Sequence, residues 1–239
     1  RVEEEPVAIC RLKRVAADNK AGVASRLPPV TTVLNGKRVA CIGAGPASLT
    51  VARDLALKGY EVTVHDGERL PGGFIRTQIP KFRLPESVID EECGYILDRG
   101  NIRTRFGERV ESMKALLAEG YDAVFVGCGA PRGRELDVPG RKEAAANIHI
   151  GIDWLSSVSF GHIESVGKRV IVLGGGNTAM DCCRSSLRLG AESVKVIVRS
   201  GFEEMKASPW EKEDAMREGI PILNFLVPKA VVHEGGVLK

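Results

Sequence analysis

Two glycine-rich turns, each placed between an apolar strand and a helix, constrain the fold of this chain more than any other feature. The first turn, at 43–48, follows the apolar run 37–42 and opens a helical pattern over 46–58 that stops at Gly59. A second strand, predicted at 61–65 from its β-branched residues, completes strand, helix and strand within about 30 residues, the size of one βαβ unit. Because such a crossover joins parallel strands, the sequence predicts a parallel sheet.

The same arrangement recurs in the second half of the chain. A strand predicted at 169–173 leads into the turn 174–179, a helix over 178–189 and a strand at 194–198. Further helices are predicted at 86–99 and 210–218, and further strands at 102–106, 123–126 and 221–227. This alternation predicts an α/β protein with two Rossmann-like dinucleotide-binding domains and helices on both faces of the sheets.

The first turn has the residue types that a dinucleotide pyrophosphate needs. Gly43 allows the tight turn, and Gly45 has no side chain, so a pyrophosphate can approach the backbone at the start of a helix. Pro46 suits the first helical position, and Ser48 is small enough for close packing of helix on strand. Asp66, at the end of the second strand, is placed to accept hydrogen bonds from ribose hydroxyls. The alternative is a plain tight turn followed by a surface aspartate.

The second turn predicts a different ribose preference. The acid of the first unit is replaced here by Arg199, at the end of the strand 194–198. A carboxylate repels a ribose 2′-phosphate, whereas a guanidinium binds it with two hydrogen bonds. We therefore expect FAD at the first unit and NADPH at the second, with a solvated surface arginine as the alternative for Arg199.

Composition excludes several other classes of protein. With 34 Lys and Arg against 31 Asp and Glu, the net charge of +3 gives no reason to expect nucleic acid or a membrane surface as a partner. The six cysteines lack C-x-x-C or metal-ligand spacing, so we expect no metal site, no thioredoxin-reductase-like chemistry and reduced, buried thiols in the cytoplasm. The four histidines form no recognisable catalytic arrangement.

The residues after Asp66 carry a family resemblance. The segment 67–85, GERLPGGFIRTQIPKFRLP, resembles the signature of the glutamate synthase small-subunit (beta chain) family. That family includes the FAD/NADPH domains of dihydropyrimidine dehydrogenase and the flavoprotein subunit of NADH-dependent ferredoxin:NADP oxidoreductases. The resemblance extends over nearly the whole chain, through 120–130, 139–140, 174–181, 196–209 and an opening helix predicted over 4–19.

The resemblance implies a set of cofactor-binding residues and no catalytic side chain, because hydride transfer itself needs no protein acid or base. The FAD set is Gly43, Ala44, Gly45, Pro46 and Ala47 at the pyrophosphate, Asp66 at the ribose, Gly72, Gly73 and Phe74 along the flavin, Arg83 in contact with FAD, Val110 in a short strand at the adenine edge, and Gly129. The NADPH set is Gly175, Gly176, Asn177 and Thr178 at the pyrophosphate, with Arg199 and Lys206 at the 2′-phosphate.

The resemblance also implies an organisation. Residues 1–36 would be a helix and linker that follow an iron–sulfur domain, 37–150 the first part of an FAD domain, and 151–239 an inserted NADPH domain, with both domains incomplete at the C-terminus. The chain would then be an internal piece of a longer flavoprotein oxidoreductase. It would take a hydride from NADPH and pass electrons to 4Fe–4S clusters on a missing domain or a partner, such as a large glutamate synthase-type subunit.

Three alternatives remain at this stage. The electron acceptor could instead be that of a ferredoxin:NADP reductase or of a pyrimidine reductase. The chain could also be a subunit that holds nucleotides without turnover, since a fold and its motifs do not guarantee activity.

Overall fold

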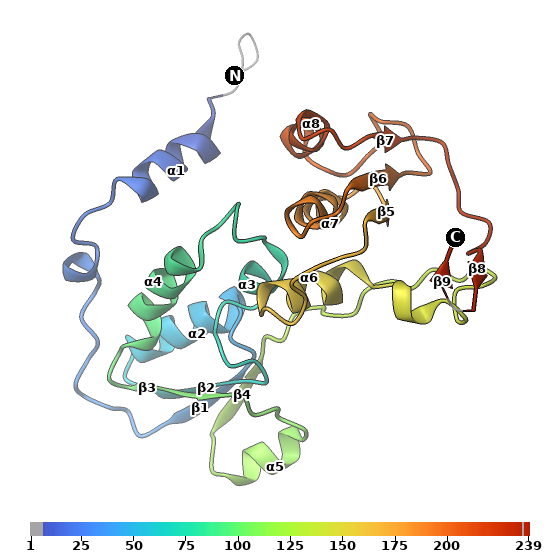
Figure 1. Cartoon of the computed structure of the whole chain (residues 1–239). Helices are drawn as coiled ribbons and strands as arrows, with labels where there is room; N and C mark the ends of the chain where they lie inside the picture. The colour runs from blue at the N-terminus through green and yellow to red at the C-terminus, as the bar shows by residue number, and fades with distance from the viewer. Residues whose placement is uncertain (1–6, 236) are drawn as a thin grey trace.

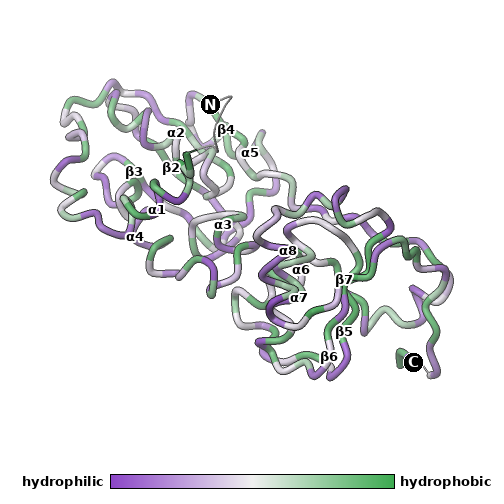
Figure 2. The backbone as a smooth tube through the Cα atoms, turned by 90° about the horizontal axis from the view of Figure 1, so that it is seen from above, coloured by the Kyte–Doolittle hydropathy of each residue, from purple (hydrophilic) through white to green (hydrophobic). Residues whose placement is uncertain are grey.

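The computed structural model describes residues 7–235 and 237–239, which form two lobes, each built on its own parallel sheet. Figure 2 shows the lobes side by side, with β2–β4 and α2–α5 labelled in the first lobe and α7, α8 and β5–β7 in the second. The predicted α/β class with parallel sheets is confirmed. The domain limits 37–150 and 151–239 stay a prediction.

The first lobe contains a sheet of four strands in the order β3-β2-β1-β4. Its strands are β1 (Arg38–Ile42), β2 (Glu61–Asp66), β3 (Ile102–Phe106) and β4 (Ala123–Val126), and neighbouring strands are all parallel. The central strands β1 and β2 are buried on both faces, so that in β2 the polar Thr63 and His65 are buried as well as Val62 and Val64. Their carboxyl ends, and the loops that follow them, meet at one edge of the sheet.

Helices cover both faces of this sheet. Helices α2 (Pro46–Ala56), α3 (Phe74–Gln78) and α4 (Glu86–Leu97) lie on one side, and α5 (Met113–Ala118) lies on the other (Figure 1). Helix α2 buries Ala52 and Ala56 in the cluster that contains Val62 and Val64 of β2. Helix α1 (Ile9–Asp18) buries none of its residues, and the part of the predicted 4–19 helix before Val7 lies outside the described residues. Single 3₁₀ turns occur at Ala24–Arg26 and Ala145–Asn147.

The second lobe contains a sheet of three parallel strands in the order β5-β6-β7. Its strands are β5 (Arg169–Leu173), β6 (Ser193–Ile197) and β7 (Ile222–Leu223), and its helices α7 (Asn177–Arg188) and α8 (Pro209–Arg217) lie side by side against it. Met180, Val196 and Ile220 are the largest apolar side chains at the centre of this lobe's core, with at most 1% of each exposed.

Helix α6 (Gly151–Ser159) lies between the two lobes. Trp154 and Leu155 pack against Cys182 of α7 in one buried cluster. On the other side, Ser159 Oγ donates to the carbonyl oxygen of Arg76 at 2.7 Å, and Gln78 Nε2 donates to that of Ile152 at 2.9 Å. Helix α6 therefore joins α3 of the first lobe to α7 of the second, and the sequence did not predict it.

One predicted strand is shorter than expected, and another does not form. The strand expected at 221–227 is limited to Ile222–Leu223, because Phe225 has a positive φ of 58° that an extended pairing does not allow. No strand forms near Val110, where the chain runs as a loop between β3 and α5. After β7, the short hairpin β8 (His233–Glu234) and β9 (Val237–Leu238) follows Val231, whose N–H donates to the carbonyl oxygen of Pro139.

Candidate cofactor-binding sites

The first glycine turn lies at the carboxyl end of β1 and touches the loop after β4 through backbone atoms. The N–H of Gly43 donates to the carbonyl oxygen of His65 at 2.7 Å. A Cβ at Gly43 would lie 2.7 Å from the carbonyl oxygen of Gly127, and its φ of +97° also disfavours any side chain. The φ of Gly43 and its close approach to Gly127 therefore both require glycine at this position, as the predicted tight turn does.

A second backbone segment lies on this turn. The N–H of Gly72 donates to the carbonyl oxygen of Ala44 at 2.9 Å. A Cβ at Gly73, whose φ is +53°, would lie 2.7 Å from the Cα of Gly45. Helix α3 then begins at Phe74, which is half exposed. The structure thus brings the predicted glycines 43, 45, 72 and 73 together, with Gly43 and Gly72 buried and Gly45 and Gly73 partly exposed.

Helix α2 starts directly at this turn. Gly45 is its N-cap, Pro46 is its first residue, and no side chain of the described residues caps its N–H groups, including that of the exposed Ala47. Ser48 is fully buried, and a Cβ at Gly127 would lie 2.3 Å from its Oγ. Gly127 therefore makes room for a serine at the third small position. Sequence reasoning did not assign Gly127 to the site, although a glycine directly after a strand was the available signal.

Asp66 ends β2 beside the turn. Its Oδ2 accepts a hydrogen bond from the N–H of Ala44 at 2.5 Å, and its Oδ1 accepts one from the N–H of Glu68 at 2.8 Å. These two bonds fix the orientation of the half-buried carboxylate. Each oxygen keeps a further lone pair that can accept from a hydroxyl.

Three other residues of the predicted FAD set come from other loops of the chain. Val110 packs half-buried against the cluster of Ala40, Leu116 and Tyr121. Gly129 lies in the exposed loop after β4 with a φ of +67°. Arg83 extends toward the second lobe, where its guanidinium pairs with Asp181. The predicted contact of Arg83 with FAD stays a prediction.

The second glycine turn repeats this geometry at the end of β5. The N–H of Gly174, with φ +134°, donates to the carbonyl oxygen of Ile197 at 3.0 Å. A Cβ at Gly175 would lie 2.9 Å from Val198 Cγ1 and 3.1 Å from Met205 Cγ. Gly176 differs, because no atom of the described residues lies within 4 Å of its added Cβ. It is the N-cap of α7, which no described side chain caps, so open space adjoins free N–H groups.

The loop before α8 lies against the second turn. The N–H of Ala207 donates to the carbonyl oxygen of Gly175 at 2.9 Å, and the N–H of Ser208 donates to Oδ1 of Asn177 at 2.8 Å. Lys206 precedes Ala207 directly in this loop. The side-chain contact of Asn177 was not expected from the sequence.

The predicted phosphate-binding cations lie beside residues that pack on the second turn. Arg199 follows Val198, and Lys206 follows Met205, the two residues nearest to a Cβ at Gly175. Both side chains are exposed, and neither makes an ion pair within the described part of the chain. Thr178 is also exposed, on the first turn of α7. Both cations are therefore free to bind an anion at this place.

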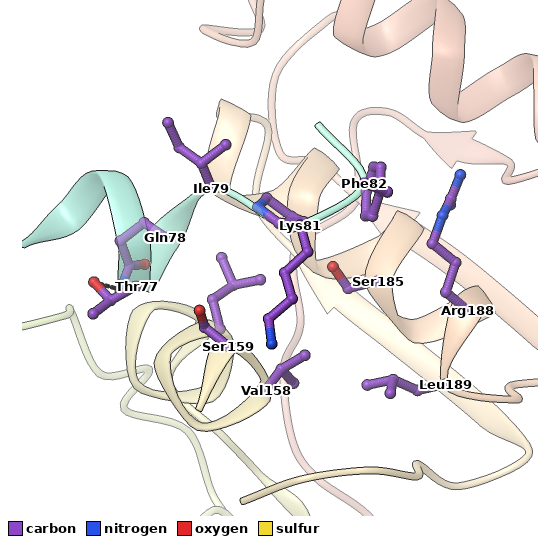
Figure 3. Close-up of a pocket in the computed structure, with 12 residues that line it drawn as sticks. Thr77, Gln78, Ile79, Lys81, Phe82, Val158, Ser159, Ser185, Arg188 and Leu189 are labelled. Atoms are coloured by element: carbon purple, nitrogen blue, oxygen red, sulfur yellow. Dashed lines mark hydrogen bonds between the residues drawn. The ribbon is translucent and has the colours of Figure 1, made fainter. Parts of the chain in front are cut away.

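A cavity of about 300 Å³ lies between the lobes (Figure 3). Residues 77–82 form one wall, and α6 and α7 form the others through Leu155, Val158, Ser185 and Leu189. The walls are mainly apolar, and Lys81 extends across the opening. The cavity is formed by the same segment, 77–82, that leads from α3 to Arg83.

Four of the six cysteines, Cys41, Cys93, Cys182 and Cys183, are buried, whereas Cys10 and Cys128 are exposed, so the expectation of buried thiols is wrong for these two. Burial raises the pKa of the thiols of Cys182 and Cys183 to about 12 and that of Cys41 to about 11. Among the described residues, no group of histidine, cysteine, aspartate and glutamate side chains could hold a metal ion. Nor does the described part of the chain contain a helix with the length and apolarity to cross a membrane.

A comparison with known protein families shows the family to which this chain belongs. The model of the pyridine nucleotide-disulphide oxidoreductase family matches residues 37–239, which include both glycine turns. The chain belongs to this family. The expectation that it is an oxidoreductase is thereby confirmed. Family members need not share one substrate, so the acceptor is a separate question.

Curated relatives in this family also confirm the resemblance seen in the sequence. The chain is 36% identical to the glutamate synthase [NADPH] small chain of Azospirillum brasilense over 81% of this chain and 42% of that protein. It is 37% identical to the beta subunit of the NADP(+)-dependent formate dehydrogenase of Moorella thermoacetica, over 99% of this chain and 37% of that one. The chain thus spans about two fifths of the length of these two relatives.

Solved structures confirm the fold. FprA from Mycobacterium tuberculosis in complex with NADPH has a TM-score of 0.65 at 18% identity, covering 87% of this chain and 62% of that one. Thioredoxin reductase of T. acidophilum has a TM-score of 0.58 at 18% identity, covering 84% and 67%.

Proposed function

We propose that this chain is the FAD- and NADPH-binding part of an electron-transfer flavoprotein of the glutamate synthase small-chain type. When bound, FAD would accept a hydride from NADPH and release electrons one at a time to an iron–sulfur acceptor. The residues of this chain would bind and orient the two dinucleotides and exclude water. None of them is needed as a general acid or base.

The observation that carries the FAD proposal is the convergence of glycine backbones at the first turn. Gly43 is pressed against Gly127, and Gly45 against Gly73, so that any Cβ at Gly43 or Gly73 would overlap the opposing main chain. These contacts place a turn without large side chains directly before α2, whose uncapped N–H groups suit a pyrophosphate. Asp66 completes the match, because its fixed carboxylate can accept hydrogen bonds from the ribose hydroxyls. The roles of Phe74, Val110 and Gly129 at FAD are proposals of the resemblance.

The NADPH proposal rests on the open space at Gly176 and on two unpaired cations. The free N–H groups at the start of α7 suit a pyrophosphate, and Arg199 with Lys206 supplies positive charge beside the same turn. A guanidinium and an ammonium at this place favour a 2′-phosphorylated ribose over a free one. NADPH is therefore the donor that this chain's residues support best.

The acceptor is proposed to be an iron–sulfur domain or subunit. The relatives are a small chain and a beta subunit by name, so each belongs to a larger assembly. The described residues offer no cluster ligands of their own. The six cysteines of the chain, without any disulfide-like spacing, favour the cytoplasm as the compartment.

Cofactor analysis of the purified holoprotein tests this proposal. Denaturation should release FAD in a stoichiometric amount, identified by chromatography against FMN and riboflavin standards. Substituting Asp66 should lower the FAD content and leave the affinity for NADPH unchanged, because NADPH belongs to the second turn. A protein that contains FMN or no flavin would contradict the proposal.

A further inference from the structure

The segment that follows α3 leaves the first lobe and joins the second lobe through one arginine. Arg83 Nη1 donates to Oδ1 and Oδ2 of Asp181, on α7, at 2.6 and 2.8 Å. Its Nη2 lies 2.5 Å from Oε1 of Glu211, on α8. The two carboxylate side chains are only 6% and 5% exposed. One guanidinium of the first lobe thus pairs with two nearly buried carboxylates of the second.

The neighbouring residue strengthens the same junction. The ring of Phe82 lies beneath the guanidinium groups of Arg188 and Arg184, whose carbons are 3.9 and 5.1 Å from its centroid. Arg184 also pairs with Glu211 at 3.1 Å and with Glu218 at 2.9 Å. Phe82 and Arg83 therefore both bind to a connected set of charges on α7 and α8.

The carboxylates of Asp181 and Glu211 need the positive charge of Arg83 to offset their mutual repulsion. Asp181 and Glu211 are like charges near each other in a dry environment, and burial raises the pKa of Asp181, while Arg83 and Arg184 oppose that rise. Asp181 receives hydrogen bonds on both oxygens from Arg83. A buried carboxylate that loses its partner is costly, whereas an exposed pair contributes little. The contact between the two lobes therefore gives the buried carboxylate of Asp181 its positively charged hydrogen-bond partner, Arg83.

The junction links the two glycine turns by a short path. Gly73 touches the first turn and directly precedes α3, which leads through residues 79–82 to Arg83. Asp181 lies on α7, about one and a half turns after Gly176, the N-cap beside the second glycine turn. The element that would hold the NADPH pyrophosphate is therefore tied to the backbone that would lie along the flavin.

We propose that Phe82 and Arg83 form a clasp that fixes the second lobe against the first, so that the nicotinamide ring meets the flavin. This inference rests on the proposed function. Arg83 is then a positioning residue, which acts through α7 rather than through contact with FAD. Its effect falls on the geometry of hydride transfer, because a displacement of about 1 Å between reacting groups can cost about a hundredfold in rate.

Arg83→Gln in the holoenzyme tests the clasp, with Arg103→Gln as the matched control. Arg103 is a 76% exposed arginine of β3 that pairs with Glu61 inside the first lobe, 3.5 Å away. Two properties are measured: amide hydrogen exchange of residues 79–84 and α8 in the apoprotein, and the rate of anaerobic flavin reduction by NADPH in the holoenzyme. FAD content and the dissociation constant of NADPH are measured in parallel.

In the Arg83→Gln variant, the backbone amides of residues 79–84 and of α8 should exchange at least about tenfold faster, while those of α2 should exchange at an unchanged rate. The rate of flavin reduction by NADPH should fall at least about tenfold. FAD content and NADPH affinity should stay at the level of the Arg103→Gln control. Phe82→Leu should change exchange and rate in the same direction by less. If Arg83→Gln does not fold, Arg83→Lys is used, which keeps one charge but loses the two-pronged geometry and should show the same two changes.

Three results would overturn the clasp. Exchange and reduction rates equal to those of the control would show that Arg83 holds nothing in place. Loss of FAD with unchanged exchange would make Arg83 a direct FAD ligand. Faster exchange with an unchanged reduction rate would make the junction a fold contact without a role in hydride transfer. Failure of the unmodified protein to reduce its flavin with NADPH refutes the proposed function instead, while the exchange measurement still tests the docking.

Discussion

Replacing Gly176 by alanine separates the binding role of the second turn from its structural role. The backbone at Gly176 has φ −101° and ψ 173°, an extended conformation that alanine adopts without strain. An added Cβ would meet no described atom within 4 Å. In the free protein the methyl group therefore enters open space, the same space that a pyrophosphate would approach.

The two expected magnitudes differ clearly. Alanine is a poorer N-cap than glycine by about 0.5–1 kcal/mol, but it lowers the entropy of the unfolded chain, which stabilises by about 0.4–1 kcal/mol. The free energy of unfolding should therefore change by less than about 1 kcal/mol. A methyl group that blocks one hydrogen bond to a charged phosphate costs about 1.5–3 kcal/mol, so the dissociation constant of NADPH should rise about 10- to 100-fold.

The assay pairs thermal unfolding of the apoprotein with a calorimetric titration by NADPH. Gly175→Ala is the matched control, because its Cβ would press on Val198 and Met205, so overpacking of about 1–3 kcal/mol should lower its Tm. FAD content should be normal in Gly176→Ala, since FAD belongs to the other turn. An unchanged NADPH dissociation constant in Gly176→Ala would refute the assignment of this turn.

Three further predictions follow from the sites. Asp66→Ala should lower FAD affinity about tenfold or more in equilibrium dialysis, because hydrogen bonds to a charged group are worth about 1.5–3 kcal/mol, and unchanged retention would remove Asp66 from the FAD site. Arg199→Glu should lower the ratio of kcat/KM for NADPH over NADH at least about tenfold in steady-state assays, and Lys206→Ala should lower it less; equal weakening of both donors would contradict a 2′-phosphate contact. At pH 8, thiol titration of the folded protein should modify the exposed Cys10 and Cys128 first. The raised pKa of Cys182 and Cys183 leaves almost no thiolate at these two positions, so rapid reaction of Cys182 and Cys183 would contradict their burial.

The βαβ units could be predicted because their signals are local. An apolar run indicates β1 and β-branched residues indicate β2, while Pro46 marks the first residue of α2 and Gly59 ends the helical pattern. Helix α6 could not be predicted, because its sequence has no side-chain cap and its stability comes from contacts with α3 and α7 that are distant in the chain. The short β7 shows the same limit, since strand pairing stops where Phe225 takes a left-handed conformation.

In the candidate sites, too, local motifs could be predicted from the sequence, whereas contacts between distant segments could not. Motif spacing predicted the glycines of both turns, Asp66 and Arg199, and the family resemblance predicted Lys206, while their roles at the cofactors stay predictions. The approach of Gly127 to Gly43 and the pairing of Arg83 with Asp181 depend on loops that meet only in the folded protein. Sequence spacing identifies residues that a motif requires, but it does not identify the partner that a long side chain finds in three dimensions.

Anaerobic titration of the oxidised holoprotein with NADPH tests the assignment of FAD to the first turn and of NADPH to the second. The visible absorbance of the bound FAD should bleach on addition of NADPH. NADH should bleach it at least about tenfold more slowly at equal concentration, because it lacks the 2′-phosphate that Arg199 and Lys206 would bind. A flavin that NADPH leaves oxidised, or that NADH reduces faster, would contradict the assignment of the two dinucleotide sites.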